Sequence, residues 1–275
     1  MARAGPGWFT AVLAQSLAQT PFGAAMTTTR RGLRVVSYAD ADRALLDQVG
    51  ALKIRAWPRF MLEDDVADEY YGEMLDSFPD CQWLLVEDSC VLAAGHAVPF
   101  EWAGALPDDG WDWVLKRSVE GHRRGRAADA MSAIEICIDP AHRGRGLSHR
   151  MVAELHAVAA RRAVDHLVAP VRPSHKARYP LIAMDAYVDW VREDGQLFDP
   201  WLRVHARVGA AVERVAPRAM RVTGTVAQWE QWTGLAMPTS GRYVVEGALS
   251  PVDVDRVADR GTYVEPNVWM RHRLG

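Results

Sequence analysis

The stretch that decides the fold is IEICIDPAHRGRGLS, residues 134–148. Its apolar first half predicts a strand, and a glycine-rich turn then leads into a helix that starts at Gly146. Glycines permit a sharp turn and a close approach of a ligand, and the first N–H groups of a helix lack partners within it. The helix dipole adds partial positive charge there. The stretch therefore predicts an anion site, suited to a pyrophosphate, at a helix start.

The glycine spacing distinguishes this turn from other nucleotide-binding turns. Neither G-x-G-x-x-G nor G-x-x-x-x-G-K-[ST] is present, which argues against a dinucleotide fold and a P-loop. The stretch resembles the acyl-CoA signature of the GNAT superfamily, a strand followed by V-x-P-x-x-[RQ]-x-x-G-x-[GA] at a helix start. Ile138, Pro140, Arg143 and Gly146 match it, whereas Ser148 stands where glycine or alanine is usual. The alternative is an ordinary strand-turn-helix unit with a surface RGRG sequence.

The resemblance runs from about residue 33 to 225, and it implies both a fold and a cosubstrate. The fold is of the α/β (α+β) class, with a GNAT-like mixed, mostly antiparallel central sheet flanked by helices. The cosubstrate is acetyl-CoA or another acyl-CoA, with no metal. Strand main-chain groups would hold the pantetheine and acyl carbonyl, and the turn would hold the pyrophosphate. The implied cofactor-binding residues are Ile136, Cys137, Ile138, Arg143, Gly144, Arg145, Gly146, Leu147, Ser148 and His149.

The same resemblance implies His205 as the catalytic acid. In this family a substrate amine attacks the thioester directly, and a main-chain N–H polarises the acyl carbonyl. Many relatives place a tyrosine four residues before the glycine that ends a short helix, and here His205 stands four residues before Gly209. A histidine can donate a proton to the leaving thiolate near neutral pH. The alternative is a packed or partly exposed bystander.

Glu135 is the nearest candidate for the catalytic base. Some relatives carry a glutamate in the strand 167–171, but here that position lies in Ala169-Pro170-Val171. Strand alternation places Glu135 with Cys137 on one face. A charged residue in an otherwise apolar strand requires a reason, and catalysis and a buried ion pair would each supply one. A water chain is a further alternative for the base.

Composition and charge narrow the classes of partner. The chain of 275 residues is 49% apolar and 24% charged, as in soluble globular proteins. A net charge of −3 gives no field that attracts nucleic acid or an anionic membrane. No apolar run approaches the roughly 20 residues of a membrane helix. Cys81, Cys90 and Cys137 form no disulfide or zinc motif, which fits a reducing cytoplasm.

Periodicity predicts a strand, two helices, three strands, a helix, a strand, a helix and further strands. Asp40 is expected to cap the first helix and Gly95 to mark a bulge. Residues 101–130 are interpreted as a polar linker containing a solvated basic loop at 117–126. The expected strands are 32–38, 82–87, 90–100, 132–138, 167–171, 211–215 and 220–226, and the expected helices are 40–57, 66–78, 147–159 and 200–208.

Three regions are expected along the chain. Residues 1–31 form a poorly ordered N-terminal extension, residues 32–226 a GNAT-like acyltransferase domain, and residues 227–275 a Trp-rich C-terminal extension packed on the core. The long insertion at 172–199 is expected to shape the acceptor pocket together with the first two helices, because long ordered loops often cover active sites. Its aromatic residues could equally pack on the core.

The leading functional hypothesis is transfer of an acetyl or other acyl group from acyl-CoA to an amine of a small molecule. Neither nucleic acid nor membrane is expected as a partner, and a homodimer is left open. One alternative is a noncatalytic acyl-CoA-binding module, because the strand glutamate is missing and His205 replaces tyrosine. Another is a GNAT-like domain that acts on a carrier-bound acyl group. Fold alone does not choose among these three.

Overall fold

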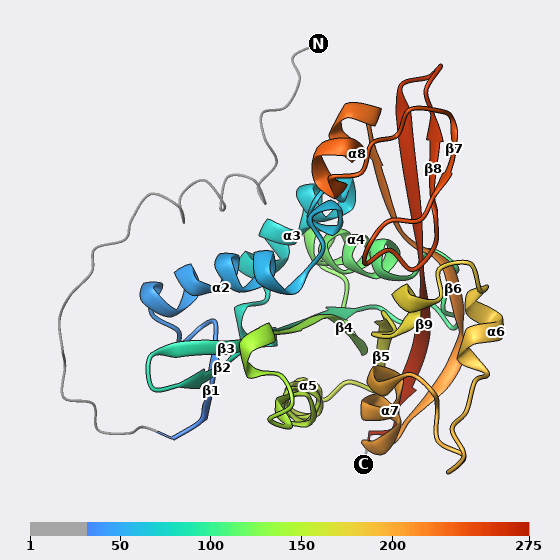
Figure 1. Ribbon diagram of the computed structural model, residues 1–275. Coiled ribbons are helices and arrows are strands. Elements are labelled where there is room, and N and C mark those ends of the chain that lie inside the picture. Colours follow the sequence, from blue (N-terminus) through green and yellow to red (C-terminus); the bar gives the residue numbers. More distant parts are fainter. Residues whose placement is uncertain (1–31, 275) are drawn as a thin grey trace.

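A computed structural model describes residues 32–274, so the predicted N-terminal extension, residues 1–31, lies outside the described residues. Those residues form one nine-stranded sheet in the order β1-β2-β3-β4-β5-β9-β8-β7, with β6 also paired to β9 (Figure 1). Only the β4–β5 pair is parallel, which confirms the predicted mostly antiparallel sheet. The strands are β1 (Arg34–Ser37), β2 (Gln82–Glu87), β3 (Cys90–Phe100), β4 (Ala130–Ile138), β5 (His166–Val171), β6 (Ala210–Gly224), β7 (Gly241–Tyr243), β8 (Val252–Asp255) and β9 (Arg260–His272).

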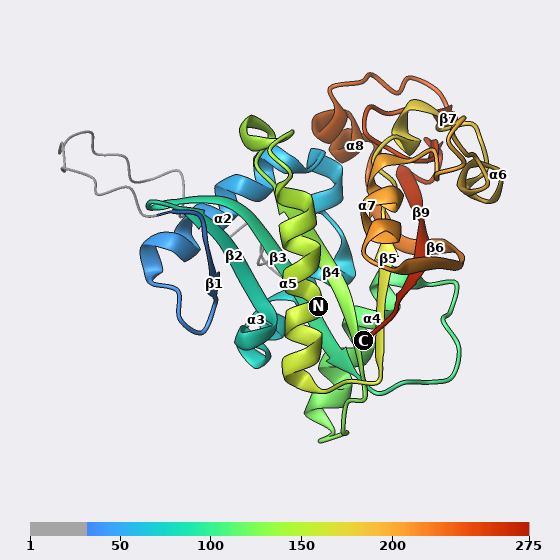
Figure 2. The same cartoon turned by 90° about the horizontal axis from the view of Figure 1, so that it is seen from below.

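Helices cover both faces of the sheet. Helices α2, α3 and α4 lie on one side of β3 and β4, and α5 crosses the other side (Figures 1 and 2). None of the helices in the described part of the chain is both long and apolar enough to cross a bilayer. The α-helices are α2 (Arg43–Ala56), α3 (Asp65–Ser77), α4 (Gly110–Arg123), α5 (Leu147–Arg162), α6 (Met184–Val188), α7 (Pro200–Arg207) and α8 (Val226–Thr233).

The starts of α2 and α3 are fixed by aspartate caps. The Asp42 carboxylate accepts a hydrogen bond from the main-chain N–H of Leu45 at 2.9 Å, so the predicted cap at Asp40 was two residues early. Asp40 lies in the preceding turn. At the start of α3, the Asp64 carboxylate accepts from the N–H of Ala67 at 2.8 Å. Each cap satisfies a donor that the helix itself leaves unpaired.

Gly95 permits a close side-chain approach in the β2–β3 hairpin. A Cβ atom at Gly95 would lie 2.2 Å from Cε2 of Trp83, so no larger residue leaves room for that indole. The register between β3 and β4 shifts one residue later, between His96 and Ala97. The predicted bulge therefore lies beside the glycine, and the glycine itself accommodates Trp83.

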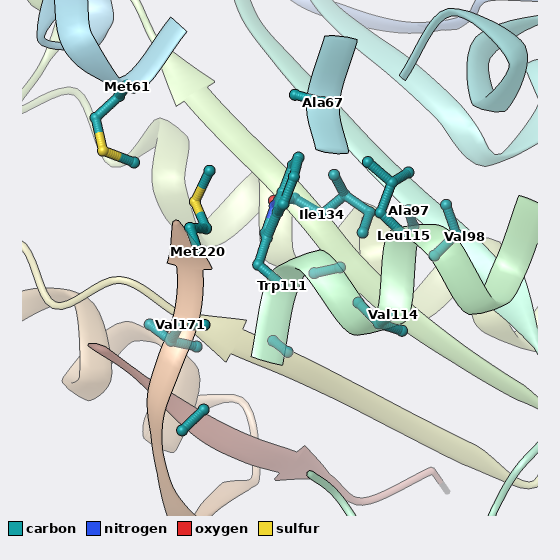
Figure 3. Close-up of a cluster of buried hydrophobic side chains, with 14 of the residues drawn as sticks. Met61, Ala67, Ala97, Val98, Trp111, Val114, Leu115, Ile134, Val171 and Met220 are labelled. Atoms are coloured by element: carbon teal, nitrogen blue, oxygen red, sulfur yellow. The ribbon is translucent and has the colours of Figure 1, made fainter. Parts of the chain in front are cut away.

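Helix α4 occupies the segment that was interpreted as a linker, so that prediction was wrong. The expected solvated loop at 117–126 was also wrong, because its first seven residues belong to this helix and Arg117 pairs with Glu101 at 3.1 Å. The Trp111 indole donates from Nε1 to the carbonyl oxygen of Ile134 at 2.7 Å and packs near Met220 (Figure 3). The buried residues have helical spacing, and they are Trp111, Val114, Leu115, Ser118 and Val119.

The parallel pair β4–β5 separates after a short contact. The two strands pair only from Ala130 to Ser132 of β4 and from His166 to Val168 of β5. Beyond that point β4 stays paired with β3 and β5 stays paired with β9. The β5-facing main-chain groups of residues 136–138 therefore have no strand partner in the described sheet, and they are available to a ligand.

Residues 210–224 form one bulged strand, β6, which corrects the predicted pair of strands. Strand β6 pairs with β9, with register shifts at Val212/Arg214 and Ala216/Met220. Pro217 lies within the second shift, where a residue without an N–H is tolerated. Strand β9 also pairs with β5, so the C-terminal segment supplies a strand of the same sheet. The domain boundary at residue 226 stays a prediction.

Candidate active site

A cavity of about 690 Å³ lies where β4 and β5 diverge. Its walls come from the unpaired end of β4, the end of β5 and the first turn of α5. The end of α2, the helix α7 and the strand β9 complete the enclosure. The polar side chains that reach this cavity include Tyr71, Glu135, Arg172, His205 and Glu265.

The turn between β4 and α5 is held in place by Asp139. Its Oδ1 accepts a hydrogen bond from the N–H of Ala141 at 2.9 Å, and its Oδ2 pairs with the Arg55 guanidinium at 2.6 Å. Gly144 and Gly146 have φ values of 80° and 73°, in the left-handed region that favours glycine. The turn thus has the backbone conformation that its glycines were expected to permit.

Gly146 is the N-cap of α5, and no side chain caps this helix start. The first N–H groups of α5 thus remain available for an anion, with the positive end of the helix dipole behind them. Nine of the ten predicted cofactor-binding residues line the cavity, whereas Arg145 turns away and pairs with Glu87 at 2.6 Å. Contact of the nine residues with the cosubstrate stays a prediction.

Glu135 lies in a buried network with residues of α2 and α3. Its Oε2 is 2.9 Å from Nζ of Lys53 and accepts from the Tyr71 hydroxyl at 2.6 Å. Its Oε1 accepts from Nε1 of Trp57. His96 is also near, with Nε2 at 3.7 Å from Oε2. The buried ion pair, one of the two reasons considered for this glutamate, is therefore present.

The network determines the protonation of Glu135. Burial favours the neutral acid, but the charge of Lys53, supported by the hydrogen bond from Tyr71, outweighs it and lowers the pKa to about 2. The carboxylate is thus ionised at neutral pH and is a weak proton acceptor. Its assignment as the catalytic base stays a prediction, and the geometry favours support of the cavity wall by an ion pair.

His205 lies in the cavity wall and contacts β9 through one ring nitrogen. Helix α7 begins at the Asp199 cap, and its sixth residue, His205, is 1% exposed. Nδ1 of His205 lies 3.0 Å from Nε2 of His272 on β9. Within residues 32–274, Nε2 of His205 has no hydrogen-bond partner, and the residue lines the cavity. Burial, followed by the charges of His272 and His156, holds the pKa of His205 well below its usual range.

Sequence comparison supplies the family. The chain is 33% identical over 247 residues, 79% of its length, to the arginine N-acetyltransferase avaD of Aspergillus versicolor, of which the match covers 85%. The chain belongs to the GNAT superfamily. This GNAT protein is an acyl-CoA-dependent N-acyltransferase, as its signature turn implied. No family model matches it.

Two solved structures share the GNAT fold. The loading GNATL domain of CurA from Lyngbya majuscula superposes with a TM-score of 0.59 at 18% identity, covering 88% of this chain and 97% of that domain. The GphF GNAT-like decarboxylase in complex with isobutyryl-CoA gives 0.55 at 18% identity, covering 88% of this chain and 100% of that structure. Both likenesses cover more of the chain than the resemblance in sequence, because 88% coverage exceeds the span 33–225.

The insertion at 172–199 of the GNAT protein lines the cavity and also packs internally. Arg172, Ser174, His175 and Arg178 line the cavity, and their contact with an acceptor stays a prediction. Its aromatic rings instead pack against one another, and Lys176 is buried, donating to the main-chain oxygen of Leu249 at 2.6 Å. The packed rings are Tyr179, Tyr187, Trp190 and Phe198.

Several cavity residues of the GNAT protein were not anticipated. Trp111 comes from the helix that was missed, and Glu265 and Asn267 come from β9. Their positions depend on pairing between distant segments, although the helical spacing around Trp111 was visible in the sequence. The described residues contain no group of three or more His, Cys, Asp or Glu side chains suited to holding a metal.

Proposed function

We propose that this enzyme transfers the acetyl group of acetyl-CoA to an amine of a small cationic acceptor such as arginine, and that it does so in the cytoplasm. The arginine N-acetyltransferase name of the relative supports the acceptor class. The observation that carries the proposal is the Glu265 carboxylate in one cavity wall, where it pairs with Arg172, a second cavity residue. A carboxylate in this wall gives a cationic side chain a partner of opposite charge.

Two further carboxylates lie beside this wall. Asp64 is completely buried, and Asp112 directly follows the cavity-lining Trp111. Arg172 balances Glu265 at 2.8 Å, but neither Asp64 nor Asp112 has a salt bridge to any described residue. Burial first, then the neighbouring carboxyl groups, raises the pKa of both aspartates. A cation bound beside these groups would favour their ionised forms, which favours a positively charged acceptor over a neutral one.

The residues suit direct transfer without a covalent enzyme intermediate. The acyl carbonyl accepts a hydrogen bond from an unpaired N–H of β4, in the segment 136–138, and the CoA pyrophosphate binds at the start of α5. The amine nitrogen attacks the carbonyl carbon, and the C–S bond breaks as the tetrahedral intermediate collapses. His205 lines the cavity and protonates the departing thiolate through Nε2, the ring nitrogen that has no hydrogen-bond partner among the described residues.

A thiol-release assay with paired acceptors tests the proposal. Arginine and citrulline have the same length, but citrulline lacks the positive charge, so we expect kcat/KM for arginine to be higher by about 10-fold or more, worth about 1.4 kcal/mol. Lysine, ornithine and agmatine extend the series, and mass spectrometry identifies the acetylated nitrogen. Equal rates with arginine and citrulline would remove the acidic wall as the basis of recognition.

Ligand-dependent unfolding tests the cosubstrate. A ligand at 100 times its dissociation constant should stabilise the fold by about 2.7 kcal/mol. We expect acetyl-CoA and free CoA to raise the unfolding midpoint, and acetyl-pantetheine to raise it less because it lacks the pyrophosphate. Equal stabilisation by acetyl-pantetheine would favour a carrier-bound acyl donor, and stabilisation without thiol release from any amine would favour a binding module.

Asp64→Asn should stabilise the protein at alkaline pH. The pKa of Asp64 in the fold lies above its ordinary value of 3.8, so the native state holds this proton more tightly than the unfolded chain does. The penalty for ionising Asp64 therefore grows as pH rises above 3.8 towards the raised value. Asparagine keeps the cap and removes the charge, so we expect a gain of about 2–4 °C in midpoint at pH 8, from about 1 kcal/mol.

The gain from Asp64→Asn should shrink at pH 5, which separates an electrostatic cause from better packing. Asp42→Asn is the matched control, because Asp42 caps α2 in the same way at an exposed position. We expect Asp42→Asn to leave the midpoint unchanged at both pH values. A loss of stability in Asp64→Asn at pH 8 would show that the carboxylate is compensated in the native state.

A further inference from the structure

Three histidines from three different elements form one hydrogen-bonded chain. His205 on α7 lies with Nδ1 at 3.0 Å from Nε2 of His272 on β9. The other nitrogen of His272, Nδ1, lies 2.9 Å from Nε2 of His156 on α5. His205 and His272 are 1% and 3% exposed, whereas His156 is only half-buried. The chain thus starts at the cavity and ends at a ring that reaches the surface.

Burial favours the neutral form of all three rings. Burial lowers the pKa of His272 to about 3, with His156 adding to the effect, and it also lowers the pKa of His156. The pKa of His205 is lowered by burial and by the other two histidines. A neutral imidazole carries one N–H and one bare nitrogen, so each ring can both donate and accept. No carboxylate or Lys/Arg charge contributes to these three shifts.

We propose that His205, His272 and His156 form a proton relay that connects the active-site cavity with solvent. This inference rests on the proposed role of His205, and it extends that role to His272 and His156 as positioning residues that act through it. Each of the two contacts joins a nitrogen of one ring to a nitrogen of the next, His205 lines the cavity, and His156 is half-buried. A buried acid that must be reprotonated in every cycle requires such a path.

The relay balances the protons of the reaction. The ammonium group of the amine first loses one proton to water; the neutral amine and acetyl-CoA then give the N-acetyl product and free CoA thiol, so one proton leaves the nitrogen and one reaches the sulfur. When Nδ1 of His205 carries its hydrogen, Nε2 is bare and accepts a proton from the amine. The Nδ1 hydrogen then passes to Nε2 of His272, the Nδ1 hydrogen of His272 passes to Nε2 of His156, and the Nδ1 hydrogen of His156 leaves to solvent.

After that transfer each of the three rings carries its hydrogen on Nε2 instead of Nδ1. Nε2 of His205 now carries a hydrogen, and it can protonate the thiolate sulfur as the C–S bond breaks. The vacancy on His205 is filled through Nδ1 from His272, which in turn takes a proton from His156 and solvent. One chain therefore serves the base step and the acid step in alternation, which offers a source of base function that does not require Glu135.

The substitution His272→Gln tests the relay directly. A glutamine amide can donate to one neighbour and accept from the other, so it can keep both hydrogen bonds, but it does not pass a proton between them. We expect kcat to fall by about 10-fold or more while KM for acetyl-CoA and the unfolding midpoint stay close to those of the parent enzyme. His156→Gln, at the half-buried end, should lower kcat less and recover with added imidazole.

The matched control is His122→Gln, because His122 is exposed, lies on α4 and is remote from the cavity. The parent enzyme and the His122→Gln control should show a solvent deuterium effect with contributions from more than one proton, and His272→Gln should reduce it to one. Parent-level kcat and an unchanged isotope effect in His272→Gln would overturn the relay.

A measurement that needs no turnover tests the relay even if the enzyme acetylates none of the amines. That result would contradict the proposed acceptor and not the relay. Nitrogen-15 NMR of labelled histidine reports which ring nitrogen carries the hydrogen. The relay predicts that Nδ1 and Nε2 of His272 give averaged shifts from exchange between two tautomers, and that His156→Gln shifts this average. A single fixed tautomer at all three rings would overturn the proposal independently of any assay.

Discussion

Replacing His205 with glutamine should lower kcat by about 10²-fold, because the only donor assigned to the leaving thiolate is then lost. KM for acetyl-CoA should change by about twofold at most, since the cosubstrate is held by β4 and by the first turn of α5 rather than by α7. Glutamine fills a similar volume and can still bond to Nε2 of His272. Steady-state kinetics with saturating arginine and varied acetyl-CoA measure both constants.

The pH profile separates His205 from an ordinary surface histidine. Because its pKa is lowered well below 6.5, the ring stays neutral as pH falls through that value. We therefore expect kcat at saturating amine to show no loss between pH 7.5 and about 6 that is due to histidine protonation. His166→Gln is the control, because His166 stacks on Trp102, with ring centroids 4.5 Å apart, and does not line the cavity. A His205→Gln variant with unchanged turnover would remove the acid assignment.

The central β4–α5 unit could be predicted because its signals are local. A strand, a glycine turn and an amphipathic helix each depend on neighbours within a few residues, and β4, α5 and β5 lie where the sequence placed them. Helix α4 had an equally local signal in Trp111 and Val114 through Val119. Its charged outer face and the basic residues at its end led to an interpretation as a polar linker, although the apolar residues have helical spacing.

The partners of the catalytic candidates could not be predicted in the same way. His205 and His272 are 67 positions apart, and Glu135 meets Lys53 and Tyr71 from 82 and 64 positions away. These contacts exist because β9 inserts beside β5 and because α2 and α3 pack over β4. A single sequence indicated that Glu135 needed a partner, but not which lysine would supply it.

The separation of β4 from β5 links the fold to the chemistry. A fully paired sheet would occupy the main-chain groups on the β5-facing edge of residues 136–138, whereas the divergence after Ser132 leaves that edge without a strand partner. The same divergence leaves room for the cavity that both Glu135 and His205 line. The ion pair behind Glu135 therefore supports the wall on which the acyl group is expected to lie.

Lys53→Met should destabilise the enzyme by about 3–5 kcal/mol, because it leaves the Glu135 carboxylate buried without its compensating charge. The midpoint should fall by about 10 °C or more. Arg43→Met on the same helix is the control: it breaks the exposed Arg43–Asp47 pair, whose side chains are 81% and 58% exposed, and should change stability by about 0.5 kcal/mol or less. Thermal and urea unfolding of both variants measure the difference.

The pH dependence of the same variant identifies the charge on Glu135 as the cause. In the parent enzyme the pKa of Glu135 is lowered from 4.5 to about 2, so its contribution to stability is present above 4.5 and is lost as pH falls towards 2. Without Lys53, burial raises that pKa, and the carboxyl group can escape its penalty by binding a proton. The deficit of Lys53→Met should therefore be larger at pH 8 than at pH 5.

The double variant Lys53→Met/Glu135→Gln then distinguishes two roles of Glu135, as part of the cavity wall and as the catalytic base. Removing both charges should restore most of the lost stability, since a neutral amide can still accept from Tyr71 and Trp57. If Glu135 only supports the cavity wall, the refolded double variant should keep kcat within about 10-fold of the parent. A loss of about 10² to 10⁴-fold in a stable double variant would instead assign Glu135 as the catalytic base, and the histidine chain would then serve the thiolate alone.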